Sequence, residues 1–154
     1  MKRAKLMLLI VAFGLFISGV TVWPAIPELK LGNRILSLTG ESTGALQQFV
    51  SRVIEGLEAV ERDYPFLMYG YDWLAFAHIC LAILFAGAIK DPVRNKWIVQ
   101  CGLIMCFLIP FLAAICIPIR EIPWFWFCID FAFAPAAALP LWIALRDINH
   151  AEQN

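Results

Sequence analysis

The chain has 154 residues, of which 62% are hydrophobic and only 16% are charged. Soluble domains are about half apolar and about a quarter charged, so the composition excludes an ordinary soluble domain. The formal charges sum to zero, which leaves neither a basic stripe for nucleic acid nor an acidic tail. The sequence also lacks a Walker loop, the H-E-x-x-H motif of metalloproteases and the G-x-S-x-G motif of serine hydrolases.

Four apolar stretches are long enough to cross a bilayer, because a spanning helix needs about 20 mostly apolar residues. They lie at about 6–23, 73–89, 97–119 and 124–145, and Asp130 is the only Asp, Glu, Lys or Arg within them. The six tryptophans lie at or near the ends of these stretches, where indole rings prefer the headgroup layer. We therefore predict an all-α integral membrane protein in which residues 1–154 form a single domain of four transmembrane helices.

The first span follows three basic residues, Lys2, Arg3 and Lys5. This start resembles the beginning of a secretory signal peptide, but no cleavage site of small residues follows the apolar run. Pro24 and Pro27 then end the helix, because proline lacks an N–H donor and disfavours the helical conformation of the residue before it. We expect an uncleaved membrane anchor.

The outer segment, 24–72, is expected to contain one loop and one helix. Residues 28–41 are of mixed composition and are expected to form a loop against the outer surface. From about 44 to 63, apolar residues recur every three or four positions, which indicates an amphipathic helix that ends at Tyr64-Pro65. The apolar positions are Leu46, Phe49, Val50, Val53, Ile54, Leu57 and Val60.

The polar face of the 44–63 helix is acidic. Helices that lie on anionic lipid are usually rich in Lys and Arg, so we expect this helix to pack on the protein itself or on a partner, as a lid, a cap or a docking surface. Its expected polar contacts follow helical spacing. They are an N-cap from Ser42 or Thr43 and the pairs Arg52–Glu55 and Glu58–Arg62.

The second span carries small residues on one face, at Ala75, Ala82 and Ala86. Small residues let helices approach closely in a membrane. This face and the 44–63 helix are therefore the two candidate surfaces for a protein partner or for a second copy of the chain.

Several charged residues at helix boundaries are interpreted as structural. Asp72 immediately precedes the second span, where an N-cap is needed, and Asp91 precedes Pro92 at the start of the next turn. The adjacent Arg120 and Glu121 are interpreted as an ion pair at the membrane interface.

The third and fourth spans contain four prolines, at Pro110, Pro118, Pro135 and Pro140. A proline inside a span frees a backbone carbonyl, which in lipid must find another donor. Two interpretations remain open. The spans are broken and line a binding site, as in many transporters, or they are kinked in a way that only aids packing.

The positions of Lys and Arg predict that both termini lie in the cytoplasm, because short cytoplasmic flanks are enriched in these residues. Between Pro24 and Tyr71, four basic residues face six acidic ones, a net charge of −2, as expected of an outer segment. We therefore expect a multi-pass protein of the cell (cytoplasmic) membrane. The basic residues that flank the inner ends of the spans are Lys2, Arg3, Lys5, Lys90, Arg94, Lys96 and Arg146.

Two ionisable residues lie inside the predicted spans, where a polar group is costly. His78 and Asp130 each lie about seven residues, or roughly 10 Å, from the outer end of a span. If the two helices are neighbours, the side chains are within reach of each other, and Arg120 at the outer rim could turn toward Asp130. The pair is then either a hydrogen bond that fixes helix packing or an acid–base site open to the outer face.

A metal or haem site is a third interpretation of these residues. His78, Cys80, Cys116, Cys128 and Asp130 are candidate ligands for a soft or borderline metal. No C-x-x-C motif is present, so a thiol–disulfide relay lacks its usual sequence. A bis-histidine haem would need a second histidine within the spans, and the sequence assigns no cofactor.

Two functional hypotheses follow from the sequence. The first is an accessory or interaction subunit of a membrane assembly, with the 44–63 helix as its contact surface. The alternative is a small membrane enzyme or transporter for a lipid-like or apolar substrate, in which His78, Asp130 and Arg120 carry the chemistry, assisted by Glu121 or Asp72. Both hypotheses place the functional surface on the outer side, and no functional site is expected at the inner end.

Overall fold

The computed structural model describes residues 1–38 and 44–153, and every regular element within these residues is a helix. Four helical segments in this part of the chain are long and apolar enough to cross a membrane. The all-α fold and the presence of four such segments are therefore confirmed. The segments are α1 (Lys2–Val22), the short η1 (Pro65–Met68) with α4 (Tyr69–Lys90), α5 (Lys96–Ile119) and α6 (Trp124–Glu152).

Three of the predicted spans have different ends in the structure, and the first of them, α1, begins at Lys2 rather than at about residue 6. α4 begins before Trp73, because η1 leads directly into it. α6 continues past Leu145 to Glu152. The residues after Leu145 include neither glycine nor proline, so nothing ends the helix where the apolar run ends.

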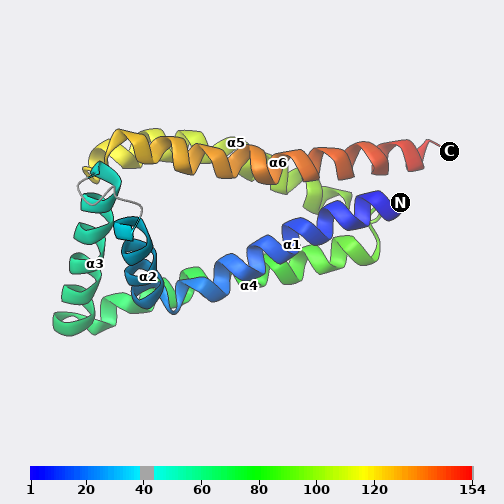
Figure 1. Cartoon of the computed structure of the whole chain (residues 1–154). Helices are drawn as coiled ribbons and strands as arrows, with labels where there is room; N and C mark the ends of the chain where they lie inside the picture. Colours follow the sequence, from blue (N-terminus) through cyan, green and yellow to red (C-terminus); the bar gives the residue numbers. More distant parts are fainter. Residues whose placement is uncertain (39–43, 154) are drawn as a thin grey trace. The chain divides into compact units, whose positions relative to one another are not determined.

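The chain forms two compact units (Figure 1). Unit 1 consists of Met1–Leu15 and Cys80–Asn154, and unit 2 consists of Phe16–Ile79. The long helices α1 and α4 therefore contribute one part to each unit.

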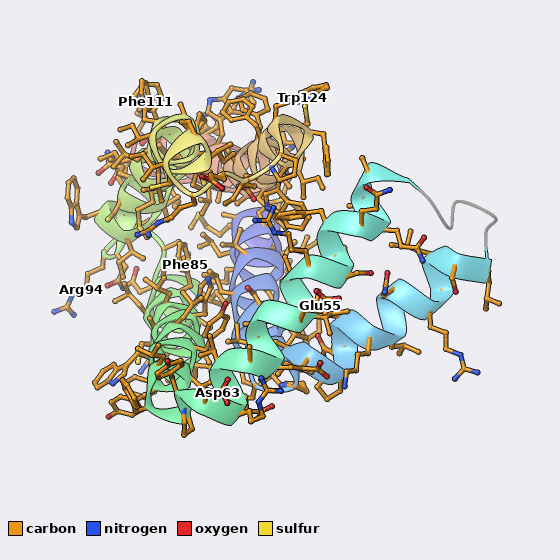
Figure 2. All side chains as sticks on the ribbon, turned by 90° about the vertical axis from the view of Figure 1, so that its left-hand side faces the viewer. Glu55, Asp63, Phe85, Arg94, Phe111 and Trp124 are labelled. Carbon is orange, nitrogen blue, oxygen red and sulfur yellow. The ribbon has the colours of Figure 1, made fainter. Side chains whose placement is uncertain are left out.

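Unit 1 has an apolar core to which all four of its helices contribute. Leu8, Phe85, Val99 and Leu141 are buried in it, and Phe85 points inward between the helices in Figure 2. Gly102 of α5 allows a close approach, since a Cβ there would lie 3.0 Å from both Leu141 Cδ1 and Phe85 Cζ.

The prolines of the third and fourth spans do not interrupt their helices. α5 runs through Pro110 and Pro118, and α6 runs through Pro135 and Pro140. The interpretation as broken spans is therefore wrong. Each proline removes one backbone hydrogen bond, and the bonds on either side keep the helix continuous.

Unit 2 contains a helix that the sequence pattern did not predict, α2 (Ala25–Leu38). The loop expected at 28–41 is therefore wrong for residues 28–38. Pro27 lies in the first turn of α2, where a missing N–H costs little because the first N–H groups of a helix have no partner inside it. Glu28 in the same turn places a carboxylate at the positive end of the helix dipole.

The helix expected at about 44–63 is present as α3 (Ala45–Asp63). It buries Val50, Ile54 and Leu57, which share one face. Its N-cap position is Gly44, with no side-chain capping bond. The predicted caps, Ser42 and Thr43, lie outside the described residues.

The end of α3 is as predicted. The N–H of Tyr64 donates to the carbonyl of Val60 at 2.8 Å and closes the helix. Pro65 then opens η1.

A close contact joins α1 and α4 within unit 2. A Cβ on Gly19 would lie 2.8 Å from the carbonyl oxygen of Ala75 and 2.9 Å from Cγ1 of Ile79. Only glycine permits this approach. Ala75 and Ala82 are buried within the chain, while Ala86 is exposed, and a role of this alanine face in oligomerisation stays a prediction.

The charged residues at the helix boundaries have different roles. The Asp91 carboxylate accepts a hydrogen bond from the Arg94 N–H at 3.1 Å, so the predicted cap is confirmed. Asp72 lies in the first turn of α4 rather than at its N-cap, because η1 starts the segment earlier. There its charge faces the positive end of the helix dipole.

The turn between α5 and α6 is closed by a Schellman-type arrangement. Ile122 N–H donates to Ile117 O at 3.0 Å, and Glu121 between them has a φ of 53°. Glycine usually takes this left-handed position, because a Cβ is strained there. Glu121 and Arg120 form no ion pair among the described residues, so the interface pair expected of them is not formed.

Candidate functional site

His78 lies half-buried on the part of α4 that belongs to unit 2. Its Nδ1 is 2.8 Å from the carbonyl oxygen of Leu74, one turn earlier. Because a carbonyl only accepts, Nδ1 carries a proton in this bond and Nε2 is left as the acceptor of the neutral ring. The orientation of the imidazole is therefore set by its own helix.

Asp130 lies on α6 and Arg120 at the C-cap of α5, both in unit 1. Neither side chain forms an ion pair with any residue that the structure describes. The contact expected between Arg120 and Asp130 is therefore not formed. Because His78 lies in unit 2, its pairing with Asp130 stays a prediction.

Within the part of each unit that the structure describes, the cysteines and acidic residues form no ligand cluster. No group of three or more His, Cys, Asp or Glu side chains in the described parts of the chain is arranged to hold a metal ion. All five cysteines are free thiols, including Cys80, Cys116 and Cys128. The arrangement gives no support to the metal interpretation.

The hairpin of α2 and α3 is the main structure of unit 2 outside the long apolar helices. The two helices lie side by side (Figures 1 and 2). Lys30 of α2 forms an ion pair with Glu58 of α3 at 2.5 Å. Asn33 donates from Nδ2 to the Ser51 hydroxyl at 3.1 Å. These polar bonds join the two helices beside the apolar contacts of α3.

The ion pairs predicted along α3 differ from those that form. Glu58 pairs across the hairpin with Lys30, and Arg62 pairs with the adjacent Asp63 at 2.9 Å. The hydrogen bond to Asp63 raises the pKa of the Arg62 guanidinium above its ordinary value. The Glu58 partner was predicted wrongly because the sequence pattern did not reveal α2, the helix that carries Lys30.

A polar groove of about 330 Å³ runs between α2 and α3. Arg34 and Gln47 line it together with Asn33 and Ser51. The Asn33 Oδ1 atom is buried without a protein partner among the described residues. A buried amide oxygen of this kind is usually satisfied by water, so the groove has room and polarity for solvent.

The exposed side of α2 is apolar. Leu31, Ile35 and Leu38 leave 61%, 54% and 80% of their surface exposed, and their spacing places them on one face. Lys30 and Arg34 lie beside this stripe on the same helix. Apolar residues flanked by Lys and Arg are typical of a helix that lies in the headgroup layer of a membrane.

The exposed side of α3 is charged. Arg52 and Glu55 are exposed and form no ion pair within the described residues. Gly56 lies on the same side, and a Cβ there would meet no atom within 4 Å. This face is therefore open, and no other described part of the chain neutralises its charges.

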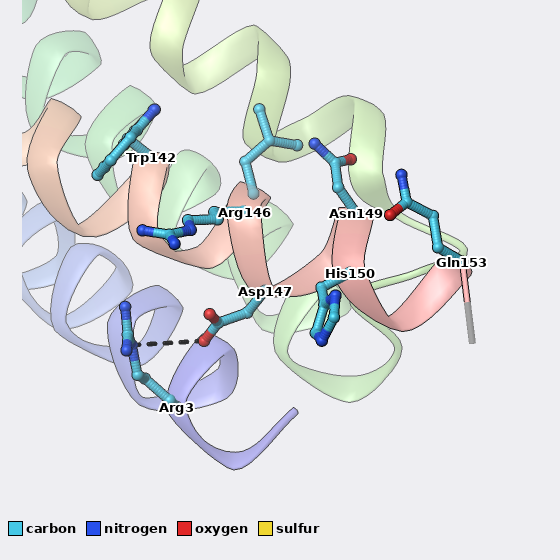
Figure 3. Close-up of a pocket in the computed structure, with 8 residues that line it drawn as sticks. Arg3, Trp142, Arg146, Asp147, Asn149, His150 and Gln153 are labelled. Atoms are coloured by element: carbon cyan, nitrogen blue, oxygen red, sulfur yellow. Dashed lines mark ion pairs between the residues drawn. The ribbon is translucent and has the colours of Figure 1, made fainter.

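A basic cavity of about 600 Å³ lies in unit 1, where the first turn of α1 meets the last turns of α6 (Figure 3). Arg3 of α1 pairs with Asp147 of α6, with 3.5 Å between Nε and Oδ2. The other lining residues are Trp142, Leu145, Arg146, Asn149, His150 and Gln153. The polar ones come from the helical extension of α6 beyond the predicted span.

This end of unit 1 is also joined by direct polar contacts. Lys5 Nζ donates to the carbonyl of Lys90 at 3.2 Å, and Lys96 pairs with Glu152 at 2.5 Å. The end that the sequence assigns to the inner side therefore carries more polar contacts than expected, because α6 brings polar groups of its last turns against α1 and α5. The signal was the run of polar residues after Leu145, which has no helix breaker.

Comparison with known protein families, with curated proteins and with solved structures finds no match to the chain.

Proposed function

We propose that the protein is an accessory subunit of a membrane assembly and that the exposed face of α3 is its contact surface for a partner protein. The observation that supports this most strongly is the α2–α3 hairpin. It is the largest ordered part of the chain outside the four apolar segments, and its α3 face is charged and open. The proposal includes insertion in the cell membrane with both termini on the cytoplasmic side.

The two sides of the hairpin suit different environments. The apolar stripe of α2 begins shortly after α1 ends at Val22, so it starts near the membrane surface if α1 spans the bilayer. There, Leu31, Ile35 and Leu38 enter the headgroup layer and the exposed Arg34 beside them meets lipid phosphates, while Lys30 stays paired with Glu58. α3 is then the side of the hairpin that is left for a protein.

The chemistry of α3 favours a protein over lipid. Its six charged residues comprise Arg52 and Arg62 against four acids, a net charge of −2, which the ion pair of Glu58 with Lys30 reduces to −1. An acidic helix is repelled by anionic headgroups, whereas a protein surface with basic groups complements it. The apolar side of α3 is already occupied, because Val50, Ile54 and Leu57 are buried within the chain.

Substitutions at Gly56 test the contact surface without disturbing the fold. Gly56→Trp places a large side chain on the exposed face of α3, where a Cβ meets nothing. Full-length protein is extracted from its native membrane in a mild detergent, and the composition of its complex is determined by size-exclusion chromatography with mass spectrometry. We expect the wild type to elute with a partner in fixed stoichiometry and Gly56→Trp to elute without it.

Gly56→Ala is the matched control at the same position. It adds only a methyl group and should keep the complex, while raising stability by about 1 kcal/mol through helix propensity. Wild-type protein that elutes as a monomer, or a Gly56→Trp variant that keeps its partner, would refute the proposed contact surface.

A further inference from the structure

The basic cavity of unit 1 contains groups that the proposed function does not use. We propose that it binds a phosphate group, carried by a phospholipid headgroup or present as free phosphate. The inference concerns unit 1 alone and is independent of the contact surface on α3.

The charges of the cavity favour an anion. Arg3 and Arg146 contribute two guanidinium groups against the single carboxylate of Asp147. Arg146 is exposed and forms no ion pair within the described residues. The lining therefore carries an excess positive charge, and the guanidinium group of Arg146 has no acceptor in the described part of the chain.

The second guanidinium is only partly satisfied. Arg3 reaches Asp147 at 3.5 Å through Nε, whereas strong charge-assisted hydrogen bonds are about 2.7–2.9 Å long. Its terminal nitrogens have no acceptor among the described residues. Figure 3 shows Arg3 and Arg146 approaching the cavity from two different helices.

Guanidinium groups suit phosphate for a geometric reason. Their planar fork of N–H donors matches two phosphate oxygens at once, and the group is weakly hydrated. Asn149 and Gln153 add amide donors one and two turns further along the same face of α6. The cavity thus offers both charge and neutral donors to one anion.

The apolar part of the lining favours a phospholipid as the source of the phosphate. Trp142 and Leu145 precede Arg146 on α6, so the cavity changes from apolar to basic along the helix. Basic pockets between helices at a span end are a known arrangement for anionic headgroups. The volume, about 600 Å³, lies within the range of roughly 300–1,000 Å³ that small-molecule sites occupy.

Three probes are titrated into delipidated full-length protein in a non-ionic detergent: short-chain phosphatidylglycerol, short-chain phosphatidylcholine and inorganic phosphate. Binding is measured by native mass spectrometry and calorimetry. Arg146→Gln should weaken binding by about tenfold, because it removes the free guanidinium. Asp147→Asn should strengthen binding about threefold, because it removes the competing carboxylate and releases Arg3.

Arg94→Gln is the matched control, since Arg94 lies in the turn before α5, outside the cavity, and points away from the helices in Figure 2. It should leave binding unchanged, and the thermal midpoints of all three variants should stay within a few degrees of the wild type. Arg146→Lys keeps the charge without the fork and should recover only part of the affinity.

The outcomes separate the sources. Binding of phosphatidylglycerol without competition from inorganic phosphate supports the inference and identifies a lipid headgroup, while competition by inorganic phosphate supports it with free phosphate as the ligand. The inference fails if no probe binds. It also fails if Arg146→Gln and Arg94→Gln weaken binding equally, since the binding would then be non-specific attraction to surface charge. A failure here leaves the Gly56 experiment unaffected.

Discussion

At the scale of single residues, Gly19 determines how closely α1 and α4 approach. A Cβ added to Gly19 would clash with the backbone of Ala75 and with the side chain of Ile79. The sequence shows a glycine in an apolar run but not what lies opposite it. Gly14 of the same helix looks alike in the sequence, yet a Cβ there would meet nothing within 4 Å.

Gly19→Ala should therefore destabilise the protein by about 1–3 kcal/mol, because the helices must move apart to admit the methyl group. Gly14→Ala should leave stability unchanged or raise it slightly through helix propensity. Thermal unfolding of both variants in the same detergent checks the comparison. Equal midpoints would mean that the contact at Gly19 does not exist.

His78 and Asp130 test the alternative hypothesis of an enzyme or transporter. The hydrogen bond from His78 to Leu74 lies within α4, and Asp130 forms no ion pair with the described residues. Neither His78 nor Asp130 therefore bonds one helix to another in the described structure. If the pair carries chemistry, His78→Ala and Asp130→Asn should each abolish function while the yield of folded protein stays the same.

The readout for the pair is the amount of folded protein by fluorescence-detected size-exclusion chromatography, together with growth of a deletion strain that carries each variant. Loss of folded protein in both variants would show a structural role instead. That result would remove the alternative hypothesis.

At the scale of helices and turns, the apolar pattern predicted the long elements well and the polar ones poorly. α1, α5 and α3 lie close to their predicted ranges, because an uninterrupted apolar or periodic run fixes a helix. α2 was missed because prolines and a glycine read as loop residues, although proline in a first turn is compatible with a helix. The last turns of α6 were missed because the prediction followed hydropathy, which does not report where a helix ends.

The turn between α5 and α6 gives a prediction for Glu121. Its positive φ is unfavourable for any residue with a Cβ, and glycine is preferred at this position of a Schellman turn. Glu121→Gly should stabilise the protein by about 1 kcal/mol. The change is measured as a rise in Tm, with Arg120→Gly, at the preceding C-cap position, as a control that should not stabilise.

At the scale of the whole molecule, the sequence supports a four-segment helical chain but not the placement of its polar groups. Lys and Arg mark which flanks carry charge, yet they do not show that Arg3 meets Asp147 or that Lys30 meets Glu58. Those pairs join residues far apart in the chain, and no local pattern encodes them. The predicted pairing of His78 with Asp130 depends in the same way on tertiary packing. Their equal distance from the outer ends of their spans was therefore not enough to establish it.

With both termini in the cytoplasm, as proposed, Glu61 lies outside the cell and Gln153 lies inside it. Accessibility of single cysteines at Glu61→Cys and Gln153→Cys, with the native cysteines replaced by alanine, tests this with a membrane-impermeant maleimide. In intact cells Glu61→Cys should be labelled at once and Gln153→Cys only after permeabilisation. Labelling of both sites in intact cells, or of neither, would contradict the account.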